Sequence, residues 1–413
     1  MLGLPLAFVA LPLYVILPNH YAREFGVPLA TLGAILLGAR LFDAFIDPLL
    51  GRLSDRLFAR SPGAVLALGA AAALALALGF ALLFFPLVRE PTALIVWATV
   101  MLVLTYVGYS ALSVSHQSWG AMLGGNEAQR SRIVAWREGL GLVGVVMASV
   151  TPVALGLPAT TGLFFVMLAL GWVAWTRAVK PRAQPVTTQP VTTHAVRSPL
   201  WLPFRSKDFR RLLAVFMLNG IASAVPATLV LFFIQDRLQA PAAMEPAFLG
   251  SYFLCAALSI PLWLAVVKRI GLARTWLIGM FLAIAVFAWA TQLGAGDTLA
   301  FVVVCALSGV ALGTDLALPG AMLAGVIQAN GQSGQSEGAY FGWWNFATKL
   351  NLALAAGLAL PLLGVFGYAP GVRDAAALDA LVIAYCVLPC ALKLGATAGL
   401  YFFIIQPSKG VSP

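Results

Sequence analysis

Long apolar segments alternate with short polar segments along almost the whole chain. Twelve of these segments have about 20 residues, the length of a bilayer-spanning helix rather than of a barrel strand. They lie near residues 3–20, 29–51, 63–86, 93–118, 135–156, 160–178, 210–235, 247–267, 275–293, 298–323, 338–365 and 377–405. The pattern predicts an all-α membrane protein with twelve transmembrane helices.

The longest polar stretch divides the twelve spans into six and six. Residues 179–209 contain five prolines, and there are eight basic residues from Arg177 to Arg211 inclusive. We therefore expect an N-terminal six-helix half at residues 1–178, a basic linker at residues 179–209 and a C-terminal six-helix half at residues 210–413.

The composition agrees with a membrane protein, because 61% of the residues are hydrophobic and only 10% are charged. The net charge of +10 follows from topology. Of the 25 Lys and Arg residues, 18 lie in the C-terminal tail, in the loops that follow even-numbered spans or in the end turns of the spans next to those loops, and four lie in the opposite loops. This positive-inside distribution places both termini in the cytoplasm. We expect a bacterial-type inner-membrane protein without a nucleic-acid partner, and a monomer.

Other classes of protein find little support in the sequence. The chain begins with an apolar segment that lacks the basic region and cleavage site of a secretory signal, so we expect the first span to be retained. The four cysteines lie inside spans without histidines to complete a metal site, which predicts buried thiols and no resident cofactor. No HExxH motif occurs, and the GxSxG match Gly334-Gln-Ser-Glu-Gly338 lies in a loop between two predicted spans rather than on the strand-to-helix turn that a nucleophile elbow needs, so we expect no enzyme.

The second span carries three ionisable residues, each of which costs about 2.5–3.5 kcal/mol at the centre of a bilayer. On a helix, Arg40, Asp43 and Asp47 fall within about 60° of one another, so this face is predicted to point into the bundle. Arg40 can neutralise only one carboxylate, and the surplus one can bind a cation or take up a proton. We predict a coupling site for Na⁺ or H⁺ at Asp43 and Asp47. The alternative is a buried ion-pair network that only fixes helix packing.

The eleventh span contains a second costly residue, Lys349, with Trp344 and Asn345 about one turn before it. With the three charges of the second span, Lys349 gives a sum of zero, which favours burial of all four groups together. We therefore expect Lys349 to be the charged neighbour of the cation site, and Trp344 and Asn345 to line the solute site. Alternatively, Lys349 reaches the cytoplasmic surface by snorkelling.

The end of the fourth span is rich in hydroxyl, amide, imidazole and aromatic groups. Such groups can bind a polar solute or add oxygen ligands to a cation site. They also occur in interfacial aromatic belts and in tight helix packing, and a lone histidine is often an ordinary helix-end residue, so both interpretations stay open. The residues are Tyr109, Ser110, Ser113, His116, Gln117 and Trp119.

Three motifs together carry a family resemblance. The first is Arg40-x-x-Asp43-x-x-x-Asp47-Pro48, the second runs from Asn126 to Glu138, and the third runs from Asp315 to Lys349. They resemble motifs of the glycoside–pentoside–hexuronide:cation symporters, the melibiose-permease-like branch of the major facilitator superfamily. The resemblance implies the major facilitator fold, with a binding site between the two halves.

The resemblance also implies cation-coupled symport of a small, sugar- or glycoside-like solute. It assigns the coupling cation to Asp43 and Asp47, completion of that site to Ser110 and Ser113, and a place beside the solute to Arg137. Unlike the family's sugar carriers, this chain has no acidic residue in its first span. A lysolipid or other amphiphile is therefore an alternative cargo, and an uncoupled facilitator or scramblase is an alternative mechanism.

The segment Gly51-Arg-Leu-Ser-Asp55-Arg56, after the second span, is similar to the superfamily's cytoplasmic gate motif. By that resemblance Asp55 and Arg56 form a pair that closes the cytoplasmic side. The alternative is a plain basic turn that contributes only to topology.

Overall fold

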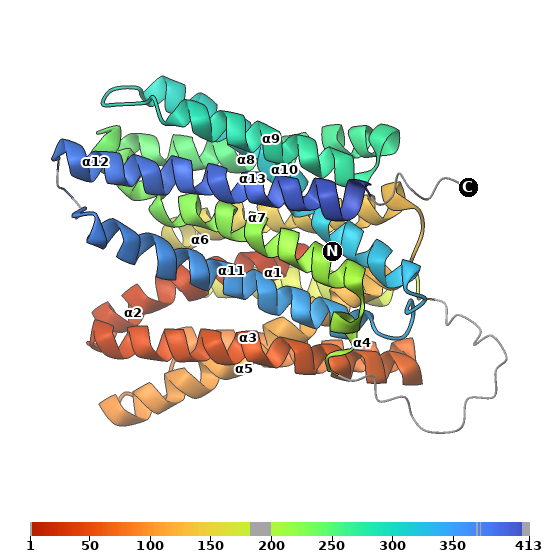
Figure 1. Cartoon of the computed structure of the whole chain (residues 1–413). Helices are drawn as coiled ribbons and strands as arrows, with labels where there is room; N and C mark the ends of the chain where they lie inside the picture. Colours follow the sequence, from red (N-terminus) through yellow and green to blue (C-terminus); the bar gives the residue numbers. More distant parts are fainter. Residues whose placement is uncertain (1, 182–199, 369–370, 372, 407–413) are drawn as a thin grey trace. The chain divides into compact units, whose positions relative to one another are not determined.

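The computed structural model describes residues 2–181, 200–368, 371 and 373–406 (Figure 1). Within these residues every regular element is a helix. Residues 182–199 of the predicted linker lie outside the described part. The chain forms two compact units, each considered by itself below: unit 1 comprises Met1–Gly124, Trp136–Pro203 and Ile327–Phe346, and unit 2 comprises Gly125–Ala135, Phe204–Val326 and Ala347–Pro413.

The first half of the chain supplies six α-helices. They are α1 (Gly3–Leu11), α2 (Leu17–Glu24), α3 (Leu29–Arg60), α4 (Pro62–Phe84), α5 (Pro91–Met122) and α6 (Glu127–Thr176). A π-helical turn, η1 (Pro12–Ile16), joins α1 to α2.

The second half supplies seven α-helices. They are α7 (Lys207–Phe232), α8 (Glu245–Ile270), α9 (Leu272–Ala290), α10 (Thr298–Ala329), α11 (Glu337–Val365), α12 (Ala375–Val382) and α13 (Leu388–Leu400). The π-helical turns are η3 (Phe233–Arg237), η5 (Ile383–Val387) and η6 (Tyr401–Ile405), and two short 3₁₀ turns are η2 (Leu202–Arg205) and η4 (Ala242–Met244).

The helices confirm the predicted twelve-span architecture. The π-helical turns connect α1 with α2, and α12 with α13, into continuous segments, whereas α6 is broken at Gly156, whose φ is +79°. This gives twelve long helical segments in the described residues, in the order of the predicted spans. Nine of them are long and apolar enough to cross a membrane.

Several helices run beyond the predicted spans because a helix does not end where its apolar residues end. The prediction ended the second span near residue 51, whereas α3 continues to Arg60 and carries Asp55 in its last turns. The next helix then begins at once: Ser61 accepts a hydrogen bond from the backbone N–H of Ala64 (3.1 Å), and Pro62 occupies the first turn.

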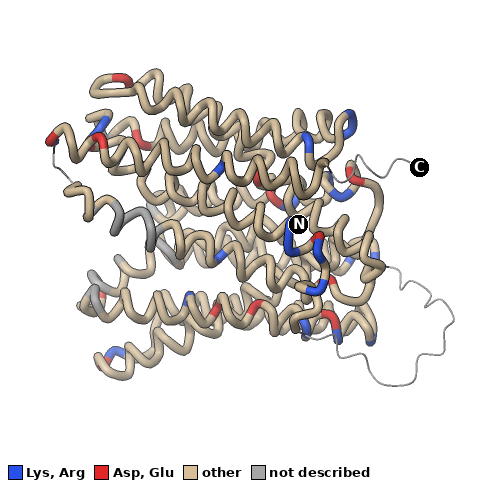
Figure 2. Tube along the Cα trace, viewed as in Figure 1, with Lys and Arg blue, Asp and Glu red and all other residues tan. Residues whose placement is uncertain are grey.

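Each unit has its own apolar core. In unit 1, α5 packs along α4 and α3, and fully buried rings such as Phe80 and Phe164 fill the space between helices. In unit 2, α13 packs along α7 and α9, and the core includes Phe233, Phe248 and Phe301. Most charged residues lie near helix ends and in loops, and few lie along the middle of a helix (Figure 2). Those few define the candidate sites.

Candidate functional site

Asp43 is the centre of the candidate site in unit 1. Its side chain is 4% exposed on α3, and its Oδ1 accepts a hydrogen bond of 2.6 Å from the hydroxyl of Ser110 on α5. The close packing of α5 along α3 brings these two residues together from 67 positions apart in sequence. The structure thus unites two of the predicted coupling residues.

Asp47 lies one turn further along α3 and is fully buried, so the second predicted carboxylate also faces the protein interior. Residues four apart on a helix have neighbouring side chains. Arg40 differs from expectation, because it is exposed although it was expected on the same buried face. Helical periodicity gives the direction of a side chain, but burial depends on which element packs at that height.

The remaining polar residues of α5 point to local partners. Ser113 accepts a hydrogen bond from Nε2 of Gln117 (2.8 Å), so these two predicted site residues pair with each other. Tyr109, next to Ser110 in the chain, is partly buried.

His116 and Trp119 belong to an aromatic cluster around Trp175 of α6. The His116 ring lies edge-on to the Trp175 ring, with 5.7 Å between the ring centroids. The Trp119 ring also lies edge-on to that of Trp175, with 5.6 Å between the centroids. Trp119 is 3% exposed, and its Nε1 donates to the carbonyl oxygen of Val179 (3.0 Å). Both residues therefore contribute to packing in unit 1, and their predicted contact with solute stays a prediction.

The predicted residues of α11 fall in different units. Trp344 is buried and Asn345 is partly buried in unit 1, whereas Lys349 is partly buried in unit 2. The predicted proximity of Lys349 to Asp43 and Asp47 therefore stays a prediction. On α6, Arg137 pairs with its neighbour Glu138 through an Nη2–Oε1 distance of 2.6 Å.

Asp55 forms a contact that the sequence indicated only in part. Its two carboxylate oxygens accept hydrogen bonds from the backbone N–H groups of Gly338 (2.6 Å) and Ala339 (2.8 Å) at the start of α11. A carboxylate is favourable there because the first N–H groups of a helix lack helical partners. The predicted pairing of Asp55 with Arg56 is wrong within the described residues, since Arg56 is exposed and forms no ion pair with Asp55.

Two glycines allow this contact. A Cβ atom built on Gly51 would overlap the carbonyl oxygen of Gly338, and one built on Gly338 would overlap that of Gly51. The backbones of α3 and α11 therefore touch directly at this crossing. Burial raises the pKa of Asp55 well above its usual range, and the two N–H bonds oppose this effect only in part.

Unit 2 contains a buried ion pair that the sequence interpretation missed. Nζ of Lys393 on α13 lies 3.1 Å from Oδ2 of Asp315 on α10, and the two side chains are 6% and 15% exposed. Both residues lie inside predicted spans, so a search for opposite charges in different spans would have indicated them.

Three further side chains complete the environment of this pair. Asp315 accepts hydrogen bonds from Nδ2 of Asn219 (3.0 Å), the hydroxyl of Ser223 (3.1 Å) and Nε1 of Trp276 (2.8 Å). Lys393 also donates to Oδ1 of Asn219 (2.7 Å). With Lys393, the carboxylate has four donors around it, which fill its usual acceptor positions.

A second N-terminal helix contact occurs in unit 2. Oε2 of Glu127, at the start of α6, accepts a hydrogen bond of 3.0 Å from the backbone N–H of Leu272, the first residue of α9. Glu127 lies in the acidic–basic motif of the family resemblance, to which the sequence interpretation assigned no such contact.

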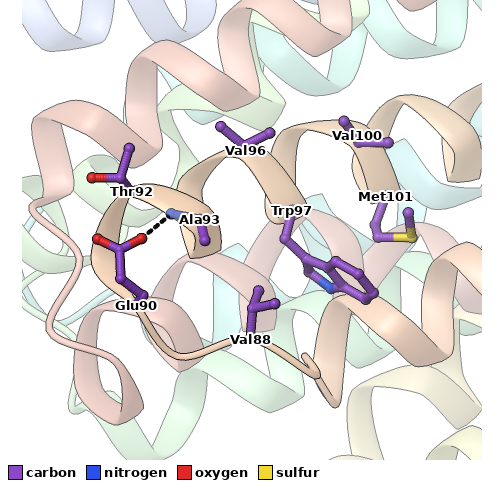
Figure 3. Close-up of a pocket in the computed structure, with 8 residues that line it drawn as sticks. All are labelled: Val88, Glu90, Thr92, Ala93, Val96, Trp97, Val100 and Met101. Carbon is purple, nitrogen blue, oxygen red and sulfur yellow. Dashed lines mark hydrogen bonds between the residues drawn. The ribbon is translucent and has the colours of Figure 1, made fainter.

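A shallow groove on the outside of α5 carries little chemistry (Figure 3). Glu90 caps the helix by accepting a hydrogen bond of 2.6 Å from the N–H of Ala93. The other residues that line the groove are mostly apolar. Val96 and Val100 are 58% and 52% exposed, as expected of a helix face in contact with lipid.

Within the described residues, no three His, Cys, Asp or Glu side chains form a group that could hold a metal ion. Asp43 and Asp47 supply two carboxylates and Ser110 adds a hydroxyl. This set suits a weakly bound monovalent cation or a proton rather than a transition metal.

A known protein of similar sequence is described as a symporter. The chain is 24% identical over 411 residues to the "Uncharacterized symporter YjmB" of Bacillus subtilis (strain 168), covering 94% of this chain and 87% of that protein.

Solved structures with the same fold are transporters as well. A bacterial homologue of the iron transporter ferroportin, in an outward-facing state, has a TM-score of 0.68 at 17% identity, covering 99% of this chain and 98% of that one. A structure of the E. coli fucose:proton symporter FucP has a TM-score of 0.68 at 15% identity, covering 95% and 96%. These similarities establish the major facilitator fold and an integral membrane protein.

The sequence profile described as "MFS/sugar transport protein" matches residues 1–406, nearly the whole chain. It supports transport as the general function and leaves the melibiose-permease-like branch a prediction. The chain belongs to the MFS/sugar transport protein family.

Proposed function

We propose that the protein is a cation-coupled symporter that carries a small organic solute, of the sugar or glycoside type, across a bacterial-type inner membrane as a monomer with both termini in the cytoplasm. The observation that carries this proposal is the pair of buried carboxylates on α3, Asp43 and Asp47, with Ser110 bonded to the first. The family match and the symporters among the similar proteins support it.

The chemistry of the pair favours a cation. Two carboxylates one helical turn apart repel each other when both are ionised and dry, so Na⁺ binding or protonation relieves the repulsion. The Ser110 hydroxyl donates its hydrogen to Asp43, so its oxygen is oriented to act as a ligand for an ion. Hard oxygen ligands of this kind fit Na⁺, and one shared proton is the alternative load.

Transport then follows from alternating access. The bond between Asp55 and the start of α11 holds the predicted cytoplasmic ends of α3 and α11 together, and it must break when that side opens. Cation binding drives the cycle only through its different affinity for the two states. By linkage, a cation that strengthens solute binding is itself bound more tightly when solute is present.

Uptake by proteoliposomes tests the proposal. Solute accumulation is compared with and without an imposed Na⁺ or H⁺ gradient for the wild type, Asp43→Asn and Asp47→Asn. Both variants should lose gradient-driven accumulation. Asp374→Asn is the matched control, because Asp374 is exposed at the start of α12 and makes no side-chain cap.

The same assay separates the rival mechanisms. Flux that ignores the gradient and is unchanged in both variants indicates an uncoupled facilitator or scramblase. Gradient-driven flux of lysolipid, with no flux of sugars or glycosides, indicates the amphiphile carrier. Either result overturns the proposed sugar symport.

A further inference from the structure

We propose that a cavity inside unit 2 binds an uncharged, hydroxyl-rich ring, such as a neutral monosaccharide or its methyl glycoside. The inference rests on the proposed function and names where and how the solute is recognised. The cavity has a volume of about 180 Å³ and is lined by residues of α7, α8, α9, α10, η5 and α13. It is smaller than the roughly 300–1,000 Å³ of pockets for drug-sized ligands, so it suits one ring.

The polar end of the cavity is formed by the ion pair of Asp315 and Lys393. Asp315 already has four donors, which occupy the usual acceptor positions of a carboxylate. Lys393 uses two of its three N–H groups, on Asp315 and Asn219, and has one left to donate. The pair therefore offers the cavity one donor and no net charge.

Two tyrosines add hydroxyls that lack protein partners. Tyr252 of α8 and Tyr385 of η5 both line the cavity, and neither hydroxyl forms a hydrogen bond within the described residues. Tyr385 is only 4% exposed and lines the cavity, so a molecule bound there can supply the hydrogen bond that its hydroxyl lacks within the described residues. Such a group indicates a ligand that completes its bonding.

Two serines supply acceptors on the same lining. Ser223 donates its hydrogen to Asp315 and Ser308 donates to the carbonyl oxygen of Cys305 (3.0 Å), so each oxygen keeps its lone pairs. The cavity thus presents both donors and acceptors. Hydroxyl groups, which are donor and acceptor at once, match this set better than any group of one kind.

Charged ligands fit the cavity less well. A carboxylate such as that of a uronate would find a single N–H of a lysine whose charge Asp315 already neutralises. An ammonium such as that of an amino sugar would find no unoccupied carboxylate oxygen on Asp315. Burying either charge without a counter-charge is unfavourable.

The walls of the cavity are aromatic. Phe248, Phe253 and Phe287 line it, and the Phe287 ring lies 5.7 Å from that of Tyr385. Flat apolar surfaces beside a few polar groups are typical of small-molecule sites, and they suit the C–H faces of a sugar ring. The aromatic walls and the polar end together define the proposed subsite.

Binding to the purified full-length protein, measured by isothermal titration in the absence of any gradient, tests the inference. The probes are neutral hexoses and pentoses, their methyl glycosides, the matching uronates and the matching amino sugars. At least one neutral sugar should bind, and the uronate and amino sugar of the same configuration should bind at least tenfold more weakly. Tighter binding of a charged analogue, or no binding of any neutral sugar, overturns the inference.

Variants that remove only a hydroxyl locate the site. Tyr252→Phe and Tyr385→Phe should each weaken binding about five- to tenfold, the loss expected for one hydrogen bond. Ser308→Ala should also weaken binding. Because Ser308 lies on α10, a different helix from either tyrosine, this variant keeps the test valid if one tyrosine variant is unstable. Tyr401→Phe, outside the cavity on η6, is the control. Wild-type affinity in all three cavity variants overturns the inference.

The two proposals fail in different measurements. If the cavity variants bind normally while Asp43→Asn and Asp47→Asn lose gradient-driven uptake, the coupling site stands and the cavity does not. If the cavity variants lose binding while both α3 variants transport normally, the cavity stands and cation coupling by Asp43 and Asp47 does not.

Discussion

Ser110 on α5 donates a hydrogen bond of 2.6 Å to Oδ1 of Asp43 on α3, and this bond fixes the carboxylate of the proposed coupling site. We predict that Ser110→Ala lowers the apparent affinity for the coupling cation by at least about tenfold, because a hydrogen bond to a charged group contributes about 1.5–3 kcal/mol. The measurement is the cation dependence of the initial uptake rate in proteoliposomes.

The control for this prediction is Ser149→Ala. Ser149 is exposed on α6, where its hydroxyl bonds, among the described residues, to the carbonyl oxygen of Val146 alone, so its loss should leave the cation dependence unchanged. An unchanged cation affinity in Ser110→Ala would show that Asp43 works without this bond.

The direct backbone contact between Gly51 and Gly338 leads to a second prediction. Gly51→Ala places a methyl group against the carbonyl oxygen of Gly338, so α3 and the start of α11 must separate and Asp55 loses its two N–H partners. We expect a destabilisation of about 1–3 kcal/mol, the usual range for overpacking. Thermal unfolding in detergent measures it.

Gly38→Ala is the matched control on the same helix. Nothing lies within 4 Å of a Cβ atom built on Gly38, so alanine should be neutral or slightly stabilising through its better helix propensity. Equal melting temperatures for the two alanine variants would contradict the tight crossing.

The sequence predicted the helices well and the partners of their charged residues poorly. Apolar length fixes where a span lies, and helical periodicity correctly turned Asp43 and Asp47 inward. Partners depend on which helices pack together. Periodicity therefore missed the exposure of Arg40, and the family resemblance gave Asp55 a neighbouring arginine in place of the α11 backbone, 283 residues away.

The ion pair of unit 2 illustrates the same limit. Asp315 and Lys393 lie 78 residues apart, and only the packing of α10 and α13 places their atoms 3.1 Å from each other. The sequence shows a lysine and an aspartate in separate spans. It does not show that Asn219, Ser223 and Trp276 complete their hydrogen bonds.

This pair leads to a third prediction. Lys393→Met leaves Asp315 buried without its counter-charge, and breaking one partner of a buried pair costs about 3–5 kcal/mol. The double variant Lys393→Met/Asp315→Asn removes both charges and should recover a large part of that loss. Unfolding monitored by fluorescence measures both, with Lys268→Met, an exposed lysine at the end of α8, as control. A double variant no more stable than Lys393→Met would contradict an energetic pairing.

The role assigned to Lys349 gives a fourth prediction. If its ammonium competes with the coupling cation, Lys349→Ala should raise the apparent cation affinity several-fold and leave the fold intact. Cation titration of uptake measures the effect. An unchanged cation affinity would leave snorkelling as the explanation for this residue.

The buried carboxylate of Asp55 makes the stability of unit 1 depend on pH. Burial raises its folded-state pKa above the unfolded value of about 3.9, so the folded state binds the proton more tightly. The stabilisation of the folded state by this proton is therefore fully present below the unfolded pKa, and it is lost as the pH rises through the raised pKa of the folded state.

Asp55→Asn cannot ionise and should remove this dependence. The melting temperature of the wild type minus that of Asp55→Asn should fall as the pH rises from about 4 towards neutrality. Glu337, whose pKa burial also raises, is present in both proteins, so its own titration largely cancels in the difference. A difference that grows with pH would mean that the N–H groups of Gly338 and Ala339 stabilise the ionised carboxylate more than burial opposes it. In that case the contact with α11 would tighten at neutral pH instead of weakening.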